Sequence, residues 1–313
     1  MRILIVGAGA LGGYFGARLH AAGRDVTFLL RPQRVQQLAA AGLHVYSPNG
    51  DVSVDHPAIV TAQGLCEPFD LILLGCKAYD LIGAMDSFAA AVGPETSILP
   101  LLNGMAHLDT LDARFGRGKV LGGLSRISAV RQPDGSIAHL GQWDSIYFGD
   151  RDQPKSDRVH RIAKALANAG FELRLSDNVM QEMWDKWCTI ATAAGITCLM
   201  RGSVGDIVAA GGTPLVNQLL QECSAIATRE GFTPSQLTLS RISDLLTEKG
   251  SSFTASMLRD LESGAPVEVH QILGDLLDHA QRGNIATPLL NIAHVNVRCY
   301  EERSRRASGE NQK

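Results

Sequence analysis

Lys186 lies in surroundings that are unusual for a lysine. It stands between Trp184 and Trp187 at the start of a largely apolar run, and the next charged residue is Arg201. In one interpretation its aliphatic stem lies along the tryptophans while the ammonium group reaches water. In the other, the ammonium group is partly removed from water, which lowers its pKa and suits it to donate a proton to a reacting atom.

Three further polar residues occupy positions where a ligand could reach them. Lys77 and Asn103 each follow a short apolar run typical of a buried parallel strand, and ligands of open α/β sheets bind at the carboxyl ends of such strands. Glu268 follows Pro266 in the predicted first turn of a helix with a regular apolar stripe. It could hold the lysine, or it could be a surface acid that interacts favourably with the helix dipole.

The first thirty residues predict a nucleotide-binding unit. A strand over 3–6 is followed by a glycine-rich loop, a helix to about residue 22 and a second strand over 26–30. The loop consists of Gly7, Ala8, Gly9, Ala10, Leu11 and Gly12. In this pattern Gly7 permits the turn, Gly9 lets the backbone approach a pyrophosphate, and Gly12 lets helix and strand pack closely. The amide groups at the helix start then face the phosphates.

The end of the second strand favours NADP(H) over NAD. Dinucleotide sites for NAD usually place Asp or Glu there, and none occurs from Val26 to Gly50. Arg31 and Arg34 follow the strand instead, and guanidinium groups suit a 2′-phosphate. The alternative is that Arg31 is an ordinary solvated residue after a strand.

The chain of 313 residues is long for one core, so we expect two domains and a tail. Residues 1–176 predict an α/β Rossmann-like domain, with hairpins at 43–54 and 128–140. Residues 177–303 predict an all-α domain with a substrate cleft against the first, and the polar residues 304–313 are expected to be disordered. Helices are expected around Lys186 with a kink at Gly195, and at 214–230, 234–248, 251–262, from 266 onwards and at 288–302.

Charge and composition exclude several classes of function. A net charge of -3 and a pI near 6.3 favour neither nucleic acid nor an anionic membrane as a partner. The six cysteines are scattered without metal-ligand spacing, so we expect no metal site and free thiols in the cytoplasm. Met1 leads directly into a strand, and the run 187–200 is too short to span a bilayer.

Six segments in order give the chain a resemblance to the ketopantoate reductases (2-dehydropantoate 2-reductases), from Met1 to about Arg303. They are GAGALG at 7–12, CKA at 76–78, LNGM at 102–105, W-x-K at 184–186, SMLRDLESG at 256–264 and PVEV at 266–269. The resemblance implies reduction of a 2-oxo acid by NADPH, and most specifically of ketopantoate to pantoate in pantothenate biosynthesis.

The resemblance also implies roles for individual residues. Lys186 would be the catalytic lysine, and Glu268 its acidic partner, which would also touch the substrate. Lys77 and Asn103 would line the site for cofactor and substrate. In addition, Ser256 would lie near the substrate carboxylate, and Arg31 would meet the 2′-phosphate. The partner would be a small 2-oxo acid, while a homodimer stays open.

The sequence departs from the family on the lysine helix. The asparagines usual four and eight residues after the lysine are here Ile190 and Ala194. Thr189 and Thr197 could supply hydroxyl groups instead, or could bond backbone carbonyls of their own helix. Two alternatives therefore stand beside ketopantoate reduction. One is an NADP-dependent reductase of a less polar 2-oxo acid, and the other is a non-catalytic NADP-binding sensor.

Overall fold

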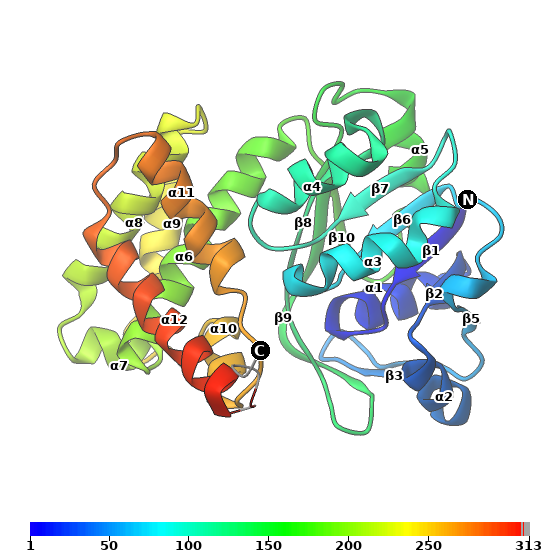
Figure 1. The fold of residues 1–313 in the computed structure, drawn as a ribbon, viewed down its shortest axis with the longest axis horizontal. Coiled ribbons are helices and arrows are strands. Elements are labelled where there is room, and N and C mark those ends of the chain that lie inside the picture. Colours follow the sequence, from blue (N-terminus) through cyan, green and yellow to red (C-terminus); the bar gives the residue numbers. More distant parts are fainter. Residues whose placement is uncertain (308, 310–313) are drawn as a thin grey trace. The chain divides into compact units, whose positions relative to one another are not determined.

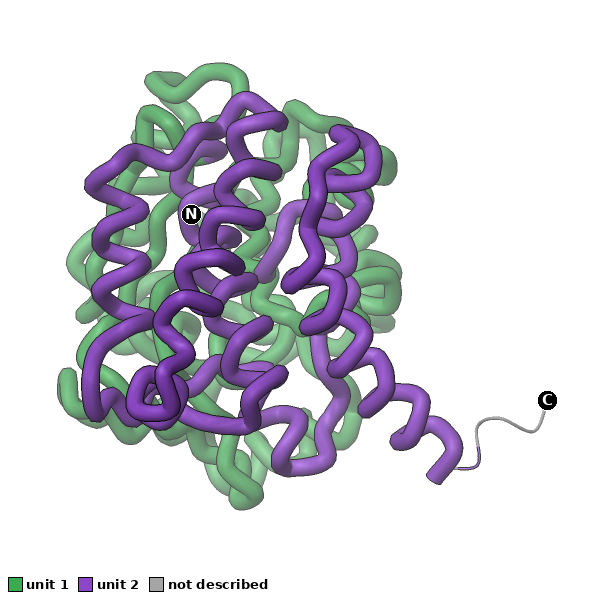
Figure 2. The backbone as a smooth tube through the Cα atoms, turned by 90° about the vertical axis from the view of Figure 1, so that its left-hand side faces the viewer, with its two compact units in different colours: residues 1–102, 107–179 green, residues 103–106, 180–313 purple. Residues whose placement is uncertain are grey.

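The computed structural model describes residues 1–307 and 309, which form two compact units (Figure 2). Unit 1 comprises residues 1–102 and 107–179. Unit 2 comprises residues 103–106 and the chain from Met180 onwards, so a short segment around Asn103 groups with the C-terminal half.

Unit 1 contains a five-stranded parallel sheet in the order β5-β2-β1-β6-β7 (Figure 1). Its strands are β1 (Arg2–Val6), β2 (Asp25–Leu29), β5 (Ala58–Val60), β6 (Leu71–Leu74) and β7 (Ser97–Pro100). All four pairings are parallel, and every residue of β6 and β7 is buried. A strand covered on both faces needs apolar residues at successive positions, which explains the continuous apolar runs. The predicted α/β class of this half is confirmed.

A second sheet has the order β10-β9-β3-β4, with β8 paired to β9. Its strands are β3 (Leu43–Tyr46), β4 (Val52–Val54), β8 (Gly122–Arg131), β9 (Ile137–Gly149) and β10 (Glu172–Leu175). Both predicted hairpins are confirmed, because β3 pairs with β4 and β8 with β9 in antiparallel fashion. The second hairpin is longer than predicted, because β8 and β9 extend well beyond 128–140.

Helix α1 (Ala10–Ala21) contacts strands of both sheets, which explains its unusual composition. Its residues from Gly12 to Leu19 are all buried, including Arg18. A helix without a solvent face has no need of a polar stripe, and small residues let it approach the sheets closely. Helices α2 (Pro32–Ala41), α3 (Leu81–Phe88), α4 (Ala106–Phe115) and α5 (Asp157–Leu166) complete the regular helices of this half.

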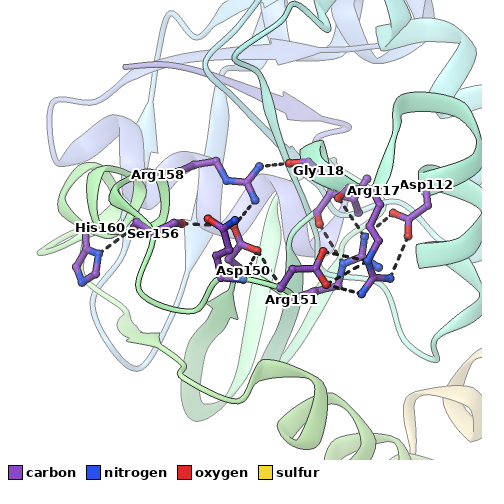
Figure 3. A network of polar contacts seen from close by, with 11 residues as sticks. Asp112, Arg117, Gly118, Asp150, Arg151, Ser156, Arg158 and His160 are labelled. Atoms are coloured by element: carbon purple, nitrogen blue, oxygen red, sulfur yellow. Dashed lines mark hydrogen bonds and ion pairs between the residues drawn. The ribbon is translucent and has the colours of Figure 1, made fainter.

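A network of ion pairs and hydrogen bonds joins helices and loops of unit 1 (Figure 3). The Arg151 side chain, only 2% exposed, donates to the Asp112 carboxylate and to the carbonyl of Val120. Nearby, Arg158 of α5 pairs with Asp150 at 2.5 Å. These side chains link α4, the end of β9 and α5, so charged residues act here as structural connections.

Unit 2 is helical, and no strand occurs among its described residues, which confirms the predicted all-α class of this half. Its helices are α6 (Val179–Met200), α7 (Val204–Ala209), α8 (Thr213–Arg229), α9 (Gln236–Leu246), α10 (Ser256–Glu262), a π turn (His270–Gly274), α11 (Asp275–Arg282) and α12 (Pro288–Ala307). Buried Glu222 of α8 accepts from the backbone N–H groups of Leu289 and Leu290, at 3.2 and 2.8 Å. This carboxylate therefore satisfies amide groups at the start of α12 that have no partner within their own helix.

Three helix predictions are wrong in their bounds. Residues 251–255 are not helical, and α10 begins only at Ser256. The helix expected from Pro266 begins after Glu268 and contains a π turn. The last helix continues to Ala307, with Arg305 paired to Glu302 at 2.9 Å, so residues 304–307 of the expected disordered tail are helical. The rest of that tail, apart from residue 309, lies outside the described residues.

Helix α6 runs without a break through Gly195, where a kink was expected. A Cβ atom at Gly195 would lie 2.8 Å from Leu219 Cδ2 of α8. The glycine therefore serves close packing of two helices and does not end a helical segment. No helix within residues 1–307 is both long and apolar enough to cross a membrane.

Candidate active site

The glycine-rich loop between β1 and α1 has the shape that a dinucleotide requires. Gly7 has φ +88°, and its N–H donates to the carbonyl of Leu29 at 3.0 Å. A Cβ atom at Gly12 would lie 2.0 Å from the Gly7 carbonyl oxygen, whereas one at Gly9 would meet nothing within 4 Å. Gly12 is therefore needed for packing, and Gly9 leaves open space above the loop.

The start of α1 is electrostatically suited to an anion. Its N-cap residue, Gly9, provides no side-chain cap, and its first turn contains no acidic residue. The first amide groups of the helix can therefore donate to a ligand, and the positive end of the helix dipole is not neutralised by a carboxylate. The loop of Gly7 to Gly12 thus fits the pyrophosphate of a nicotinamide dinucleotide.

Arg34 does not occupy the position of a phosphate ligand. Its guanidinium is buried, and Nη2 donates to the carbonyls of Ala8 at 3.1 Å and Gly135 at 2.7 Å. Burial, together with the charge of Arg131, lowers the pKa of Arg34 to about 10. Arg34 therefore supports the glycine loop through Ala8, which leaves Arg31 as the exposed guanidinium after β2.

Arg31 is 75% exposed in its side chain and pairs with Asp80 at 2.6 Å. The hydrogen bond with Asp80 and its charge raise the pKa of Arg31. Asp80 ends a short turn (Ala78–Asp80) that follows β6, whereas Arg31 follows β2. The ion pair thus connects the ends of two strands, and sequence reasoning missed Asp80 because the pair spans 49 positions.

Lys77 lies at the carboxyl end of β6, as the sequence predicted, where it begins the Ala78–Asp80 turn. The backbone just before Lys77 lies next to the glycine loop, because a Cβ atom at Gly75 would be 3.2 Å from the backbone nitrogen of Gly12. Lys77 therefore shares unit 1 with the glycine loop and Arg31. The other candidate substrate-binding residues, Asn103, Ser256 and Glu268, belong to unit 2.

In unit 2 the amine of Lys186 is fixed by a side-chain contact. Nζ donates to Asn103 Oδ1 at 3.0 Å, and Lys186 is partly buried. Trp184 and Trp187 are 3% and 1% exposed, and their rings pack on each other with centroids 4.9 Å apart. Because both tryptophans belong to the core, they do not form a surface platform for a solvated lysine.

Glu268 is 4% exposed, so it is not the surface acid that one interpretation predicted. It stands just before the helical segment that begins at Val269, and its carbonyl accepts from the N–H of Ile272 at 3.1 Å. A carboxylate with this degree of burial requires polar or charged neighbours. Its environment is therefore that of a structural or catalytic group.

Three further candidate residues lie on helices of unit 2. Ser256 is exposed at the first residue of α10. Thr189 and Thr197 donate their hydroxyl protons to the carbonyls of Asp185 and Ala193, at 2.8 and 2.7 Å. The interpretation that both threonines bond their own helix is confirmed, and Thr197 is in addition completely buried.

Neither a cluster of metal ligands nor a readily ionised thiol at Cys198 or Cys223 occurs in the described part of the chain. No group of three or more His, Cys, Asp or Glu side chains there could hold a metal ion. Burial raises the pKa of Cys198 and of Cys223 to about 12, so neither thiol is readily ionised at neutral pH.

Known proteins resemble both halves of the chain. The family model of ketopantoate reductase PanE/ApbA matches residues 3–153, and the model of its C-terminal part matches residues 178–301. An uncharacterized oxidoreductase of Bacillus subtilis, YkpB, is 32% identical over 302 residues, covering 96% of this chain and 99% of that protein. The 2-dehydropantoate 2-reductase of Mesorhizobium japonicum is 26% identical, with 95% and 97% covered.

Solved structures show the same similarity over nearly the whole chain. The 2-dehydropantoate 2-reductase of Geobacter metallireducens has a TM-score of 0.87 and 30% identity, and covers 95% of this chain and 99% of its own. A D-mandelate dehydrogenase with NADH and anilino(oxo)acetate shares the fold, with a TM-score of 0.88 and 22% identity over 97% and 100% of the two chains. The chain therefore belongs to the ketopantoate reductase family of NADPH-dependent oxidoreductases.

Proposed function

We propose that this protein reduces 2-dehydropantoate (ketopantoate) to pantoate, which serves pantothenate biosynthesis. The observation that carries this proposal is the Lys186 amine bonded to Asn103 at 3.0 Å, in the same unit as buried Glu268. The family membership and the phosphate-binding shape of the Gly7–Gly12 loop support it.

In this proposal the lysine carries the proton chemistry. NADPH, when bound, supplies the hydride for C2 of the 2-oxo acid. Lys186 has three N–H donors; one bonds Asn103, and in this proposal the ammonium group also donates to the substrate carbonyl oxygen. The ammonium group stabilises the negative charge that develops on this oxygen and then gives it a proton, which completes the 2-hydroxy acid.

The neighbouring groups hold the lysine ready for this step. Asn103 accepts from the amine and so restricts the direction in which the other N–H groups point. Glu268 keeps the amine charged and accepts from the substrate hydroxyl, while Ser256 donates to the substrate carboxylate. In unit 1, Arg31 binds the 2′-phosphate in exchange for part of its contact with Asp80, and Lys77 contributes to the cofactor and substrate side.

A second candidate is supported by one specific observation. Ile190 and Ala194 replace two amide side chains, and Thr189 has already committed its hydroxyl proton to Asp185, so it can only accept from a ligand. A buried hydroxyl left without a partner costs about 1–3 kcal/mol, or roughly 10–150-fold in kcat/KM. A 2-oxo acid with an apolar side chain avoids this cost, and the fold alone does not choose between the two.

Steady-state kinetics with a matched pair of substrates test the proposal. We would compare ketopantoate with 3,3-dimethyl-2-oxobutanoate, which lacks only the terminal hydroxyl. A preference for ketopantoate supports the proposed function, and a preference for the deoxy compound supports the apolar candidate. NADPH binding without turnover of any 2-oxo acid in a wider panel would leave the non-catalytic sensor.

The variant Ile190→Asn sharpens this test. If Ile190 lies at the hydroxyl end, the added amide raises the ratio of kcat/KM for ketopantoate over the deoxy compound by about tenfold. The same change at Ile292, which is 55% exposed on α12, is the control and should leave the ratio unchanged. An unaltered ratio in Ile190→Asn would remove Ile190 from the substrate pocket.

A further inference from the structure

One segment of unit 2 departs from α-helical geometry. Residues His270–Gly274 form a π turn between Glu268 and α11, and the N–H of Asp275 donates to the carbonyl of His270, five residues earlier. Such single turns are rare and are frequently found at functional sites. The inserted residue rotates the chain before the turn by about 100° relative to the helix after it.

The π turn is held to α6 by one buried hydrogen bond. Trp187 Nε1 donates to the carbonyl oxygen of Ile272 at 3.0 Å, and Trp187 is 1% exposed. Trp187 follows Lys186 directly in the sequence. The bond therefore ties the backbone that carries the Lys186 amine to the turn that follows Glu268.

The π turn also contacts the loop that carries Asn103. Gly104 has φ +74°, and a Cβ atom there would lie 2.3 Å from the carbonyl oxygen of Gln271. Only glycine permits this close approach of two backbones at that φ. Two successive carbonyls of the turn thus contact sequence neighbours of Asn103 and Lys186. Gln271 lies against Gly104, and Ile272 accepts the hydrogen bond from Trp187.

We propose that the π turn His270–Gly274 sets the relative positions of Lys186, Asn103 and Glu268, and that Trp187 and Gly104 are its positioning residues. This inference rests on the proposed function for its consequence in catalysis. Its physical basis is that the turn contacts the chain at or next to each of the three residues. Trp187 follows Lys186, Gly104 follows Asn103, and the carbonyl of Glu268 itself accepts from Ile272. Misplacement of a reacting group by about 1 Å can cost roughly 10²-fold in rate, so a smaller displacement has a smaller but measurable effect.

The first test replaces the indole by a ring without a donor. In Trp187→Phe, we expect kcat to fall about tenfold, while KM for NADPH stays within about twofold. Trp184→Phe is the matched control, because Trp184 lies on the same helix, is 3% exposed, and packs on the Phe232 ring. It should lower the Tm by a similar amount and leave kcat within about twofold. Equal kcat values for the two variants would overturn the inference.

A second readout does not depend on the substrate. Amide hydrogen exchange over residues 268–275 should be faster in Trp187→Phe than in Trp184→Phe, because only the former loses the bond to Ile272. Equal exchange overturns the anchoring role. If the wild-type protein turns over no 2-oxo acid, the proposed function fails, and the exchange result still decides whether the anchor exists.

A third variant separates backbone strain from contact with the turn. Gly104→Ala and Gly211→Ala both place a side chain at positive φ, +74° and +84°, but a Cβ atom at Gly211 meets nothing within 4 Å. We expect Gly104→Ala to lower kcat at least tenfold further than Gly211→Ala, with faster exchange in 268–275. Similar kcat and exchange in the two variants would contradict the proposal.

Discussion

The glycine loop of unit 1 and the lysine cluster of unit 2 present different parts of the chain to a ligand. The loop presents backbone: Gly7 has positive φ, Gly9 faces open space, and α1 begins without a side-chain cap. The cluster presents side chains, namely the Lys186 amine on the Asn103 amide. Its geometry depends on contacts of neighbouring residues with a π turn.

This difference leads us to expect that the two sites tolerate sequence change differently. Backbone amides are the same in every residue, so the loop constrains size and φ and little else. A side-chain site can lose one group while the rest stays in place. Under the proposed function, Ile190 and Ala194, which stand where the family usually has amides, belong to the second kind of site, whereas the loop keeps all three glycines.

We expect the greatest loss of activity from a change in the side-chain site. Lys186→Ala should lower kcat by roughly 10²–10⁴-fold, because the variant loses both the proton donor and the positive charge that stabilises the developing negative charge on the carbonyl oxygen. The NADPH dissociation constant, measured by fluorescence titration, should stay unchanged. Lys249→Ala, at an exposed lysine of the same unit, is the control. Near-normal turnover in Lys186→Ala would place the proton donor elsewhere.

The backbone site should respond to the addition of one carbon atom. In Gly12→Ala the Cβ atom collides with the Gly7 carbonyl, so we expect a lower Tm and NADPH binding weaker by roughly 10²-fold. In Gly9→Ala the open space lets the protein fold normally, but the methyl group enters the region of the pyrophosphate and weakens binding about tenfold. Gly118→Ala, where a Cβ atom also meets nothing within 4 Å and φ is not positive, is the matched control. Unchanged NADPH affinity in Gly12→Ala would contradict the assignment of this loop.

Arg31 is assigned to the cofactor on its charge and its place after β2. Arg31→Ala should reduce the preference for NADPH over NADH by about tenfold, or roughly 1.4 kcal/mol, measured as a ratio of dissociation constants. Arg114→Ala is a matched control, because Arg114 also pairs with an aspartate, Asp86, at 2.6 Å. An unaltered ratio in Arg31→Ala would assign the 2′-phosphate to other groups.

Side chains of unit 1 that serve structure only should give the weakest response. Burial acts to raise the pKa of Asp150, but backbone N–H groups of Asp152 and Gln153 and the Arg158 guanidinium outweigh it, so the pKa lies below its usual 3.8. A carboxyl pKa that is lower in the folded state stabilises the protein above about pH 4, and this stabilisation is lost as the pH falls through the folded-state pKa. Asp150→Asn should therefore lower the free energy of unfolding by about 1 kcal/mol at pH 7 and by little near pH 2.

Denaturant unfolding of Asp150→Asn at both pH values checks this expectation, and kcat should be unchanged. Asp86→Asn is the control, because Asp86 is 65% exposed and its pairing with Arg114 contributes little. A loss of stability of the same size at pH 2 and pH 7 would show that packing and not charge is responsible.

Features that depend on neighbours along the chain were predictable from the sequence. The strand, glycine loop and helix at 2–21 are of this kind, because turn geometry and apolar runs are local properties. Both hairpins, at 43–54 and 128–140, were predictable from their Pro, Asn, Asp and Gly residues. The positions of Lys77 and Asn103 after buried strands followed from the same local patterns.

Which polar groups meet depends instead on the tertiary fold. Arg31 and Arg34 look alike in the sequence, but one pairs with Asp80 and the other supports Ala8. Glu268 is buried although one interpretation of its place near a helix start made it a surface acid, and residues 251–255 are not helical although their pattern suggested a helix. These outcomes depend on contacts between segments that are far apart in the chain, whose energies outweigh local helix preferences of a few tenths of a kcal/mol per residue.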